Sequence, residues 1–417
     1  MTSRRALVSF GIGAGFSTLV GNGWAKASTP LLAARANRHA KKQLVCIFMR
    51  GGVDALNVVV PHGDDDYYKE RREIAVPAPG KEANSVIRLD AMFGLNPGLS
   101  ALLPLYRAGQ LGFVHAVGSP NLTRSHFDAQ DLMESGTPLD AFTRDGWLNR
   151  CVATLPTDVA TSLLRAVAVG RSLPRALYGS QAALAINDVE SFGLRAPGGV
   201  RERLQAGFRS MYGAGGDDAA NAGLAAMTTV DLVREKTAGK YVPENGAEYP
   251  KPGRPLMNVA RLLKADLGVE VAWVDAGGWD THANQGAGVG QLAGRLKDLG
   301  DSLAAFHKDM GKRMRDVVVV TLSEFGRTVS QNGTGGTDHG HGGIMLLMGG
   351  KLQGGRVFGD WPGLALDKRH EGRDLAVTTD YRAVLAEVLT RHLGLPELAQ
   401  VFPGLPSNSA LNRKLFA

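Results

Sequence analysis

The chain has 417 residues, of which 44% are hydrophobic and 21% are charged, a composition typical of a globular protein with one large domain or two ordinary ones. Its 54 glycines follow no period, which excludes a collagen-like or low-complexity chain, and it contains no apolar run long enough to span a bilayer. The net charge of +7 accompanies no basic run interleaved with aromatic residues, so nucleic acid is not an expected partner.

The first 27 residues have the layout of an export signal. Residues 3–5 are Ser-Arg-Arg, residues 6–20 form a modest apolar run, and residues 25–27 are Ala-Lys-Ala, a small-residue cleavage site. The paired arginines favour the twin-arginine route, with its translocase as the partner during export. We therefore expect residues 1–27 to be removed, leaving a protein of the periplasm or cell exterior with no stable membrane span. The alternative is an N-terminal helix that stays attached.

Five near-continuous apolar runs predict strands that are buried on both faces. These runs are residues 44–49, 112–117, 269–276, 316–322 and 343–348. Helical patterns cover residues 98–109, 200–213, 255–268, 288–314 and 378–394. Strands that alternate with helices predict an α/β fold, a doubly wound and mostly parallel sheet with helices on both faces. Residues 43–417 are expected to form this domain, with a mainly helical insertion at about 140–250.

The two cysteines, Cys46 and Cys151, provide no zinc-type framework. One disulfide between them is possible in an oxidising compartment. Cys46, however, lies inside an apolar run, where a free thiol packs as a small hydrophobe.

Polar side chains follow each of the first four apolar runs, and ligands of such sheets bind outside the carboxyl ends of the strands. The candidate residues, in chain order, are Asp54, Ser125, His126, Asp280, His282, Glu324 and Arg327. A glycine-rich stretch, residues 334–343, adds Asp338, His339 and His341 in front of the fifth run. That stretch reaches the same edge if its loop folds over the sheet or if the strand after it runs antiparallel.

Asp280 and His282 are two residues apart, so in an extended segment both can face one ion, and Asp/His ligation suits zinc or a similar divalent metal. The alternative is that Asp280 caps a following helix. At least one of Asp338, His339 and His341 is expected to be a ligand, with His339 and His341 competing for that role. The alternative there is a solvated hairpin loop.

Asp54 follows Gly51-Gly52, where the backbone can approach a ligand closely, so it is a metal candidate or else a structural cap. Glu324 is either a ligand or the ion-pair partner of Arg327. Arg327 in turn either holds substrate oxygens or braces Glu324.

Ser125 stands at the predicted start of a helix, three residues before Asp128, which is an N-cap arrangement. A helix start also favours anions and eases the charge of a nucleophile, so Ser125 is the candidate nucleophile. His126 is a candidate ligand of a second metal site or a general base.

Several segments together resemble an uncharacterised family of exported bacterial proteins, domain-of-unknown-function family 1501, of the alkaline phosphatase/sulfatase-like superfamily. The matching stretches are FMRGGVDALNVVVPHGDDDYYKER, TRSHFDAQDLMESG, VDAGGWDTHANQ, VVVVTLSEFGRTVSQNGTGGTDHGHGG and VFGDWPGL. The resemblance implies that superfamily's fold and its two-metal site. In it, Asp54 resembles the first acid, Ser125 the nucleophile, Asp280 and His282 the first pair, Glu324 the later acid, and His339 or His341 the late histidine.

The chain departs from the superfamily pattern in three places. Asp280 and His282 are two residues apart where the superfamily usually has a spacing of four, and Phe325 follows Glu324 where a histidine is usual. No cysteine or serine stands in the x-Pro-x-Arg context that a sulfatase needs to form formylglycine. One metal site is therefore expected rather than two, and sulfoesters are a weaker expectation than phosphoesters.

The sequence thus indicates an exported hydrolase or transferase that uses a divalent metal (zinc, manganese or calcium) on phosphoester-like bonds of a small-molecule or surface substrate. The alternative is a non-catalytic, metal-stabilised periplasmic or surface protein that retains the fold. The missing histidine favours the second reading, and the hydroxyl at a helix start favours the first.

Overall fold

The computed structural model describes residues 42–138, 143–156, 164–193, 198–213, 218–406 and 414–416. The expected export signal at residues 1–27 lies outside these ranges. Within them, no helix has the length and apolar character needed to cross a bilayer.

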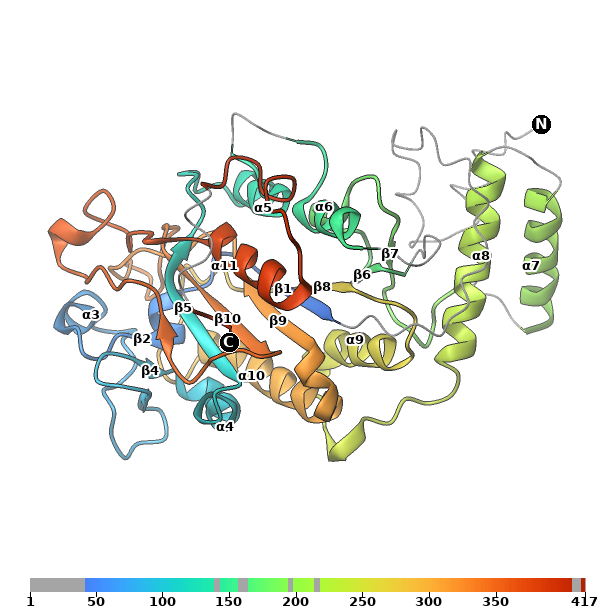
Figure 1. The fold of residues 1–417 in the computed structure, drawn as a ribbon. Helices are drawn as coiled ribbons and strands as arrows, with labels where there is room; N and C mark the ends of the chain where they lie inside the picture. The colour runs from blue at the N-terminus through green and yellow to red at the C-terminus, as the bar shows by residue number, and fades with distance from the viewer. Residues whose placement is uncertain are drawn as a thin grey trace.

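The five apolar runs form the central strands of one large sheet (Figure 1). These strands are β1 (Gln43–Arg50), β5 (Leu111–Gly118), β8 (Val271–Gly277), β9 (Val317–Leu322) and β10 (Gly343–Gly349). Four short strands extend it, namely β6 (Ala166–Val169), β7 (Ala183–Ala185), β11 (Val357–Phe358) and β12 (Thr379–Asp380). The strand order is β11-β5-β10-β9-β1-β8-β6-β7, and β12 pairs with β5.

All strand pairs in this sheet are parallel except those of β10, which is antiparallel to both β5 and β9. The register along β1 pairs Cys46 with Trp273 of β8 and with Val320 of β9. The predicted α/β class with a mostly parallel sheet is confirmed.

Helices cover both faces of the sheet. One face carries η1 (Pro97–Leu102), α4 (Leu103–Arg107), α9 (Arg254–Lys264) and α10 (Gln291–Met310). The other carries α5 (His126–Ser135), α6 (Trp147–Thr154), α11 (Tyr381–Val388) and η8 (Leu389–Leu393). In α11, within the predicted helical stretch 378–394, the side chain of Asp380 accepts a hydrogen bond from the Arg382 N–H and caps the start of the helix.

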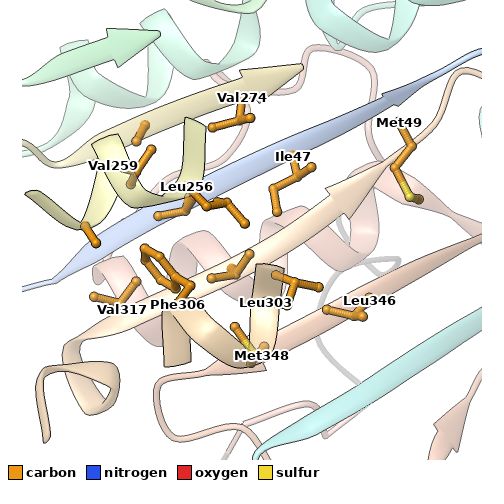
Figure 2. Packing of buried hydrophobic residues seen from close by; sticks show 14 of the residues in the cluster. Ile47, Met49, Leu256, Val259, Val274, Leu303, Phe306, Val317, Leu346 and Met348 are labelled. Atoms are coloured by element: carbon orange, nitrogen blue, oxygen red, sulfur yellow. The ribbon is translucent and has the colours of Figure 1, made fainter. Parts of the chain in front are cut away.

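Alternate residues of β1 pack into two different cores, as the period of two in a strand requires. Val45, Ile47 and Met49 face the first cluster, where Figure 2 shows Ile47 beside Leu256 of α9. Leu44 and Cys46 face the second cluster. Burial on both sides explains why the strand is an unbroken apolar run.

Cys46 and Cys151 both lie in that second cluster, and both are free and buried. Burial raises the pKa of each thiol well above its ordinary value. They act there as small hydrophobic side chains.

The stretch from about 140 to 250, expected to be mainly helical, also supplies strands β6 and β7 to the sheet. Its two long helices, α7 (Gly198–Gly213) and α8 (Asp218–Lys236), pack side by side at that end of the molecule (Figure 1). The chain then returns through η4 (Glu244–Gly246) and η5 (Lys251–Gly253) to α9.

The remaining short elements lie in the loops. A small antiparallel sheet consists of β2 (Val59–Val60), β3 (Ile87–Arg88) and β4 (Gly94–Leu95). The short helices are α2 (Ala55–Val58), α3 (Asp65–Glu70), η3 (Arg175–Leu177), η6 (Gly311–Asp316) and η7 (Leu366–Lys368).

Candidate metal centre

The candidate centre lies at the edge of the sheet where β1, β8 and β9 end and where β10 begins. Because β10 runs antiparallel, the glycine-rich loop in front of it starts from that same edge. The loop packs against the segment after β9, with the Gly340 N–H donating to the Gly326 carbonyl at 2.9 Å and the Gly326 N–H donating to the His341 carbonyl at 3.0 Å. Of the two arrangements that the sequence left open, the structure has the antiparallel strand.

Glycine is needed in this loop because the two backbones nearly touch. A Cβ atom on Gly340 would lie 2.5 Å from the carbonyl carbon of Arg327, far inside van der Waals contact. This close packing carries His339 over the ends of the neighbouring strands.

Three histidines converge on the carboxylate of Asp280. The Nε2 atom of His282 lies 3.0 Å from Asp280 Oδ1, and that of His339 lies 3.4 Å from the same oxygen. His126 Nε2 lies 3.4 Å from Asp280 Oδ2. The Nε2 atoms of His282 and His339 are 3.0 Å apart, so they face each other directly.

The Nδ1 atom of each imidazole is beside an oxygen acceptor. The pairs are His126 Nδ1 with Glu324 Oε1 at 2.8 Å, His282 Nδ1 with Asp338 Oδ1 at 3.0 Å, and His339 Nδ1 with the backbone oxygen of Arg124 at 2.9 Å. An oxygen that can only accept requires the proton to be on Nδ1, which leaves the Nε2 lone pair free. Metal-binding histidines are oriented in this way by carboxylates and backbone carbonyls.

Arg327 ties the centre to the strand ends. It is buried, and its guanidinium donates to Asp280 Oδ1 at 2.5 Å and to the carbonyls of Gly51, Gly52 and Thr337. Burial alone would raise the pKa of Asp280, but the hydrogen bond and charge of Arg327 outweigh it and hold that pKa below its ordinary value. The guanidinium therefore braces Asp280, and it does not pair with Glu324.

Two further groups of the centre have shifted pKa values. Burial lowers the pKa of His339, and the charge of Arg327 adds to this, while the hydrogen bond to the Arg124 carbonyl opposes it. The side chain of Asn332 donates to Asp338, and this bond, with help from His282, lowers the pKa of that carboxyl. A neutral His339 and an ionised Asp338 are the forms that metal ligation and its support require.

The residues present fit a divalent cation. Among the described residues, His126, Asp280 and His339 form one group whose ligand atoms all lie within 4.8 Å of one another. His126 Nε2 is buried and has no hydrogen-bond partner there. Imidazole nitrogens with one carboxylate are a donor set that zinc and similar ions prefer.

Ser125 is the N-cap residue of α5, next to His126 in the chain. Its side chain is exposed and makes no capping hydrogen bond. The hydroxyl is therefore free to act on a ligand. The first backbone N–H groups of a helix have no partner within the helix, which also favours an anion at this position.

Two of the expected metal residues lie elsewhere. Asp54 is fully buried, and its Oδ2 atom forms an ion pair with Arg71 at 2.5 Å and accepts from Gln285 at 2.6 Å. The Nδ1 atom of His341 lies 2.9 Å from Oδ2 of Asp374, so this histidine faces a different carboxylate. Of the two competing loop histidines, the structure thus places His339 in the centre and His341 outside it.

One oxygen of Glu324 is occupied by three neighbouring groups. Its Oε1 atom lies 2.8 Å from the Gly51 nitrogen, from Gln130 Nε2 and from His126 Nδ1. The residue after it is Phe325, and the ring centroids of His126 and Phe325 are 4.8 Å apart. The imidazole beside this acid therefore comes from α5.

Sequence reasoning missed Arg124 and Asp374. The Arg124 carbonyl orients His339, while its guanidinium binds Asp374 Oδ2 at 2.7 Å. Arg124 precedes Ser125 directly, so the strand-exit pattern could have included it. Asp374 follows no strand of the large sheet, and nothing in the sequence marks it.

The family described as "Protein of unknown function (DUF1501)" matches residues 114–401. A search of curated proteins finds no match.

Three solved structures show similarity to the chain at low identity. Ps i-CgsB in complex with k-i-k-neocarrahexaose has a TM-score of 0.37 and 10% identity, over 87% of this chain and 74% of that chain. Alkaline phosphatase from the Antarctic bacterium TAB5 has a TM-score of 0.27 and 11% identity, over 76% of this chain and 93% of that chain. Phosphonate monoester hydrolase of Agrobacterium radiobacter has a TM-score of 0.26 and 10% identity, over 88% of this chain and 78% of that chain.

Proposed function

Because the match to the DUF1501 family covers more than half of the chain, this protein belongs to that family, and we propose that it is a metal-dependent hydrolase or transferase acting on phosphoester-like bonds. One observation carries the proposal: three Nε2 atoms converge on Asp280 while each Nδ1 atom is held by an oxygen. His126, His282, His339 and Asp280 would hold the ion.

A divalent ion bound there supplies positive charge that stabilises an oxyanion and lowers the pKa of a nearby hydroxyl or water. The other groups position the substrate. Ser125 offers as the nucleophile an exposed hydroxyl that makes no capping hydrogen bond. The first turn of α5 offers backbone N–H groups to a substrate anion. The Asp280 side chain is 44% exposed, so the centre is open to charged and hydrated groups.

We also propose that the protein works in the periplasm or outside the cell. The support is the sequence of residues 1–27, with its paired arginines, apolar run and small-residue site. The twin-arginine route carries folded proteins, which suits a protein with a bound ion.

The test uses full-length protein stripped with a chelator and reloaded separately with zinc, manganese or calcium. We expect turnover of aryl phosphate mono- or diesters to depend on the ion, and His282→Gln to lower it by more than about 100-fold. His62→Gln, which alters an imidazole bonded to the Asp90 carbonyl, is the matched control. Turnover by stripped protein equal to that of loaded protein would contradict the proposal.

The second candidate, a non-catalytic metal-stabilised protein, is favoured by one observation. Arg327 and Asp54, two expected functional groups, are both buried and occupied by protein partners. In that case the ion still stabilises the fold, by about 3 kcal/mol at a hundred times its Kd, which a thermal shift on chelation measures. A thermal shift without turnover on the whole ester panel decides for this candidate.

A further inference from the structure

A second pair of histidines, His341 and His370, lies outside the centre described above. Their ring centroids are 4.3 Å apart. His341 comes from the loop before β10 and is 5% exposed, while His370 comes from the loop after η7, with its side chain 29% exposed. Neither belongs to the group of His126, Asp280 and His339.

The proton of His341 has a defined place. Asp374 Oδ2 lies 2.9 Å from His341 Nδ1 and also accepts from Arg124 Nε at 3.1 Å and Nη2 at 2.7 Å. A carboxylate paired with an arginine is an acceptor, so His341 Nδ1 carries the proton and Nε2 keeps its lone pair.

Both Nε2 atoms of the pair are unsatisfied. His341 Nε2 and His370 Nε2 are each buried without a hydrogen-bond partner among the described residues. Buried polar atoms in folded proteins are nearly always paired, so two such atoms on rings in contact point to something bound between or beside them. The Glu371 carboxylate is near, with Oε1 3.9 Å from His370 Nε2.

We propose that His341 and His370 bind a second divalent transition-metal ion through their Nε2 atoms. Imidazole nitrogen suits zinc, copper and nickel, and the Asp374–His341 pair is the carboxylate–histidine support found behind metal ligands. The Glu371 side chain is 57% exposed and its Oε2 atom accepts from Arg124 at 2.7 Å, so its Oε1 atom and solvent would supply the remaining oxygen ligands. The inference is independent of the proposed hydrolase activity.

The two sites are connected through Arg124. Its carbonyl accepts from His339 of the first centre, and its guanidinium holds Asp374 of the second. His370 is not bonded to Arg124, so changing His370 is the cleaner probe of the second site.

The experiment counts zinc ions per chain in stripped, reloaded and desalted full-length protein by elemental analysis. We expect two in the wild type, one in His370→Gln and one in His282→Gln. His62→Gln is the control and should keep two. A His370→Gln protein that keeps two ions, or a wild type whose single ion is lost in His282→Gln, would overturn the proposal, and a buried water would then be the occupant.

A second variant protects the test against misfolding of His370→Gln. His370→Cys replaces the imidazole with a thiolate, which also binds zinc and cobalt. We expect it to keep two ions and, when loaded with cobalt, to show a thiolate charge-transfer band in the near ultraviolet. Folded His370→Cys with one ion and no such band would equally overturn the proposal. Turnover of esters is scored separately, because loss of activity with two ions present bears on the hydrolase and not on this site.

Discussion

Ser125 is placed at the N-cap of α5 without acting as a cap. Its hydroxyl makes no capping hydrogen bond, although the backbone carbonyl of Ser125 accepts from the Ala129 N–H at 2.9 Å. A serine that does cap a helix stabilises it by about 1 kcal/mol. The hydroxyl of Ser125 contributes little of this, so folding and chemistry at this residue can be separated.

Ser125→Ala should therefore leave the free energy of unfolding within about 1 kcal/mol and the metal content unchanged. It should lower ester turnover by at least about 1000-fold, or ~4 kcal/mol in the barrier, because the attacking hydroxyl is gone. Ser119→Ala, in the same loop, is the control. Wild-type turnover in Ser125→Ala would move the nucleophile to a water.

The histidines of the centre show how single residues depend on distant partners. His126 and Glu324 are 198 positions apart in the chain, yet their contact decides which nitrogen of the imidazole is free. The same side chain with its Nε2 atom bonded to protein could not serve as a ligand.

The turns that follow the strands hold the site together through close backbone packing. Gly51, directly after β1, has φ +123, and a Cβ atom there would lie 2.6 Å from the backbone nitrogen of Asp280. Its N–H donates to Glu324 at 2.8 Å, and its carbonyl accepts from Arg327. One turn thus bonds two supporting side chains, Glu324 and Arg327, and packs against the backbone of Asp280.

Gly51→Ala should destabilise the fold by about 2–4 kcal/mol, through strain at positive φ and a backbone clash, and should lower metal affinity by displacing Asp280. Gly277→Ala is the matched control, since no heavy atom lies within 4 Å of its added Cβ, and its effect should stay within about 0.5 kcal/mol. Guanidinium unfolding and zinc titration measure both. Equal effects of the two changes would contradict the close-packing account.

Among the residues that the structure describes, His115 and His392 are the histidines buried away from both metal sites. Burial lowers the pKa of His115 to about 4, against the opposing hydrogen bond to the Val59 carbonyl, and it lowers that of His392 to about 4. The ordinary value is 6.5. Between these two values the unfolded chain binds protons that the folded chain does not, so stability falls as the pH drops.

We expect protonation of His115 and of His392 each to lower the free energy of unfolding by about 2 kcal/mol between pH 7 and pH 5. The stability they contribute is fully present above about pH 6.5 and is lost toward pH 4. In the double variant His115→Gln/His392→Gln, the free energy of unfolding should fall less between these pH values. It is measured in metal-stripped protein, relative to the variant's own value at pH 7. An unchanged slope would show that other groups cause the acid sensitivity.

The sequence by itself determined the α/β class and the central strands. The predicted runs 44–49 and 316–322 became β1 and β9, and because this apolar pattern is local, it can be recognised without knowing the strands' partners. β6 and β7 were not expected as strands of the sheet, because their alanine-rich segments of 4 and 3 residues show no clear period. Tertiary pairing with β8 made them part of it.

The candidate residues were also visible in the sequence, because polar side chains after buried strands gather at one edge of a parallel sheet. Which of these residues form the metal centre was not visible in the sequence. His339 enters the centre and His341 does not, although they are two residues apart, because the loop packs back on Gly326 and Arg327. Asp374, His370 and the pairing of Asp54 with Arg71 depend on contacts between distant segments. Which nitrogen is free and which carboxylate is occupied is a property of those contacts, so only the tertiary structure decided it.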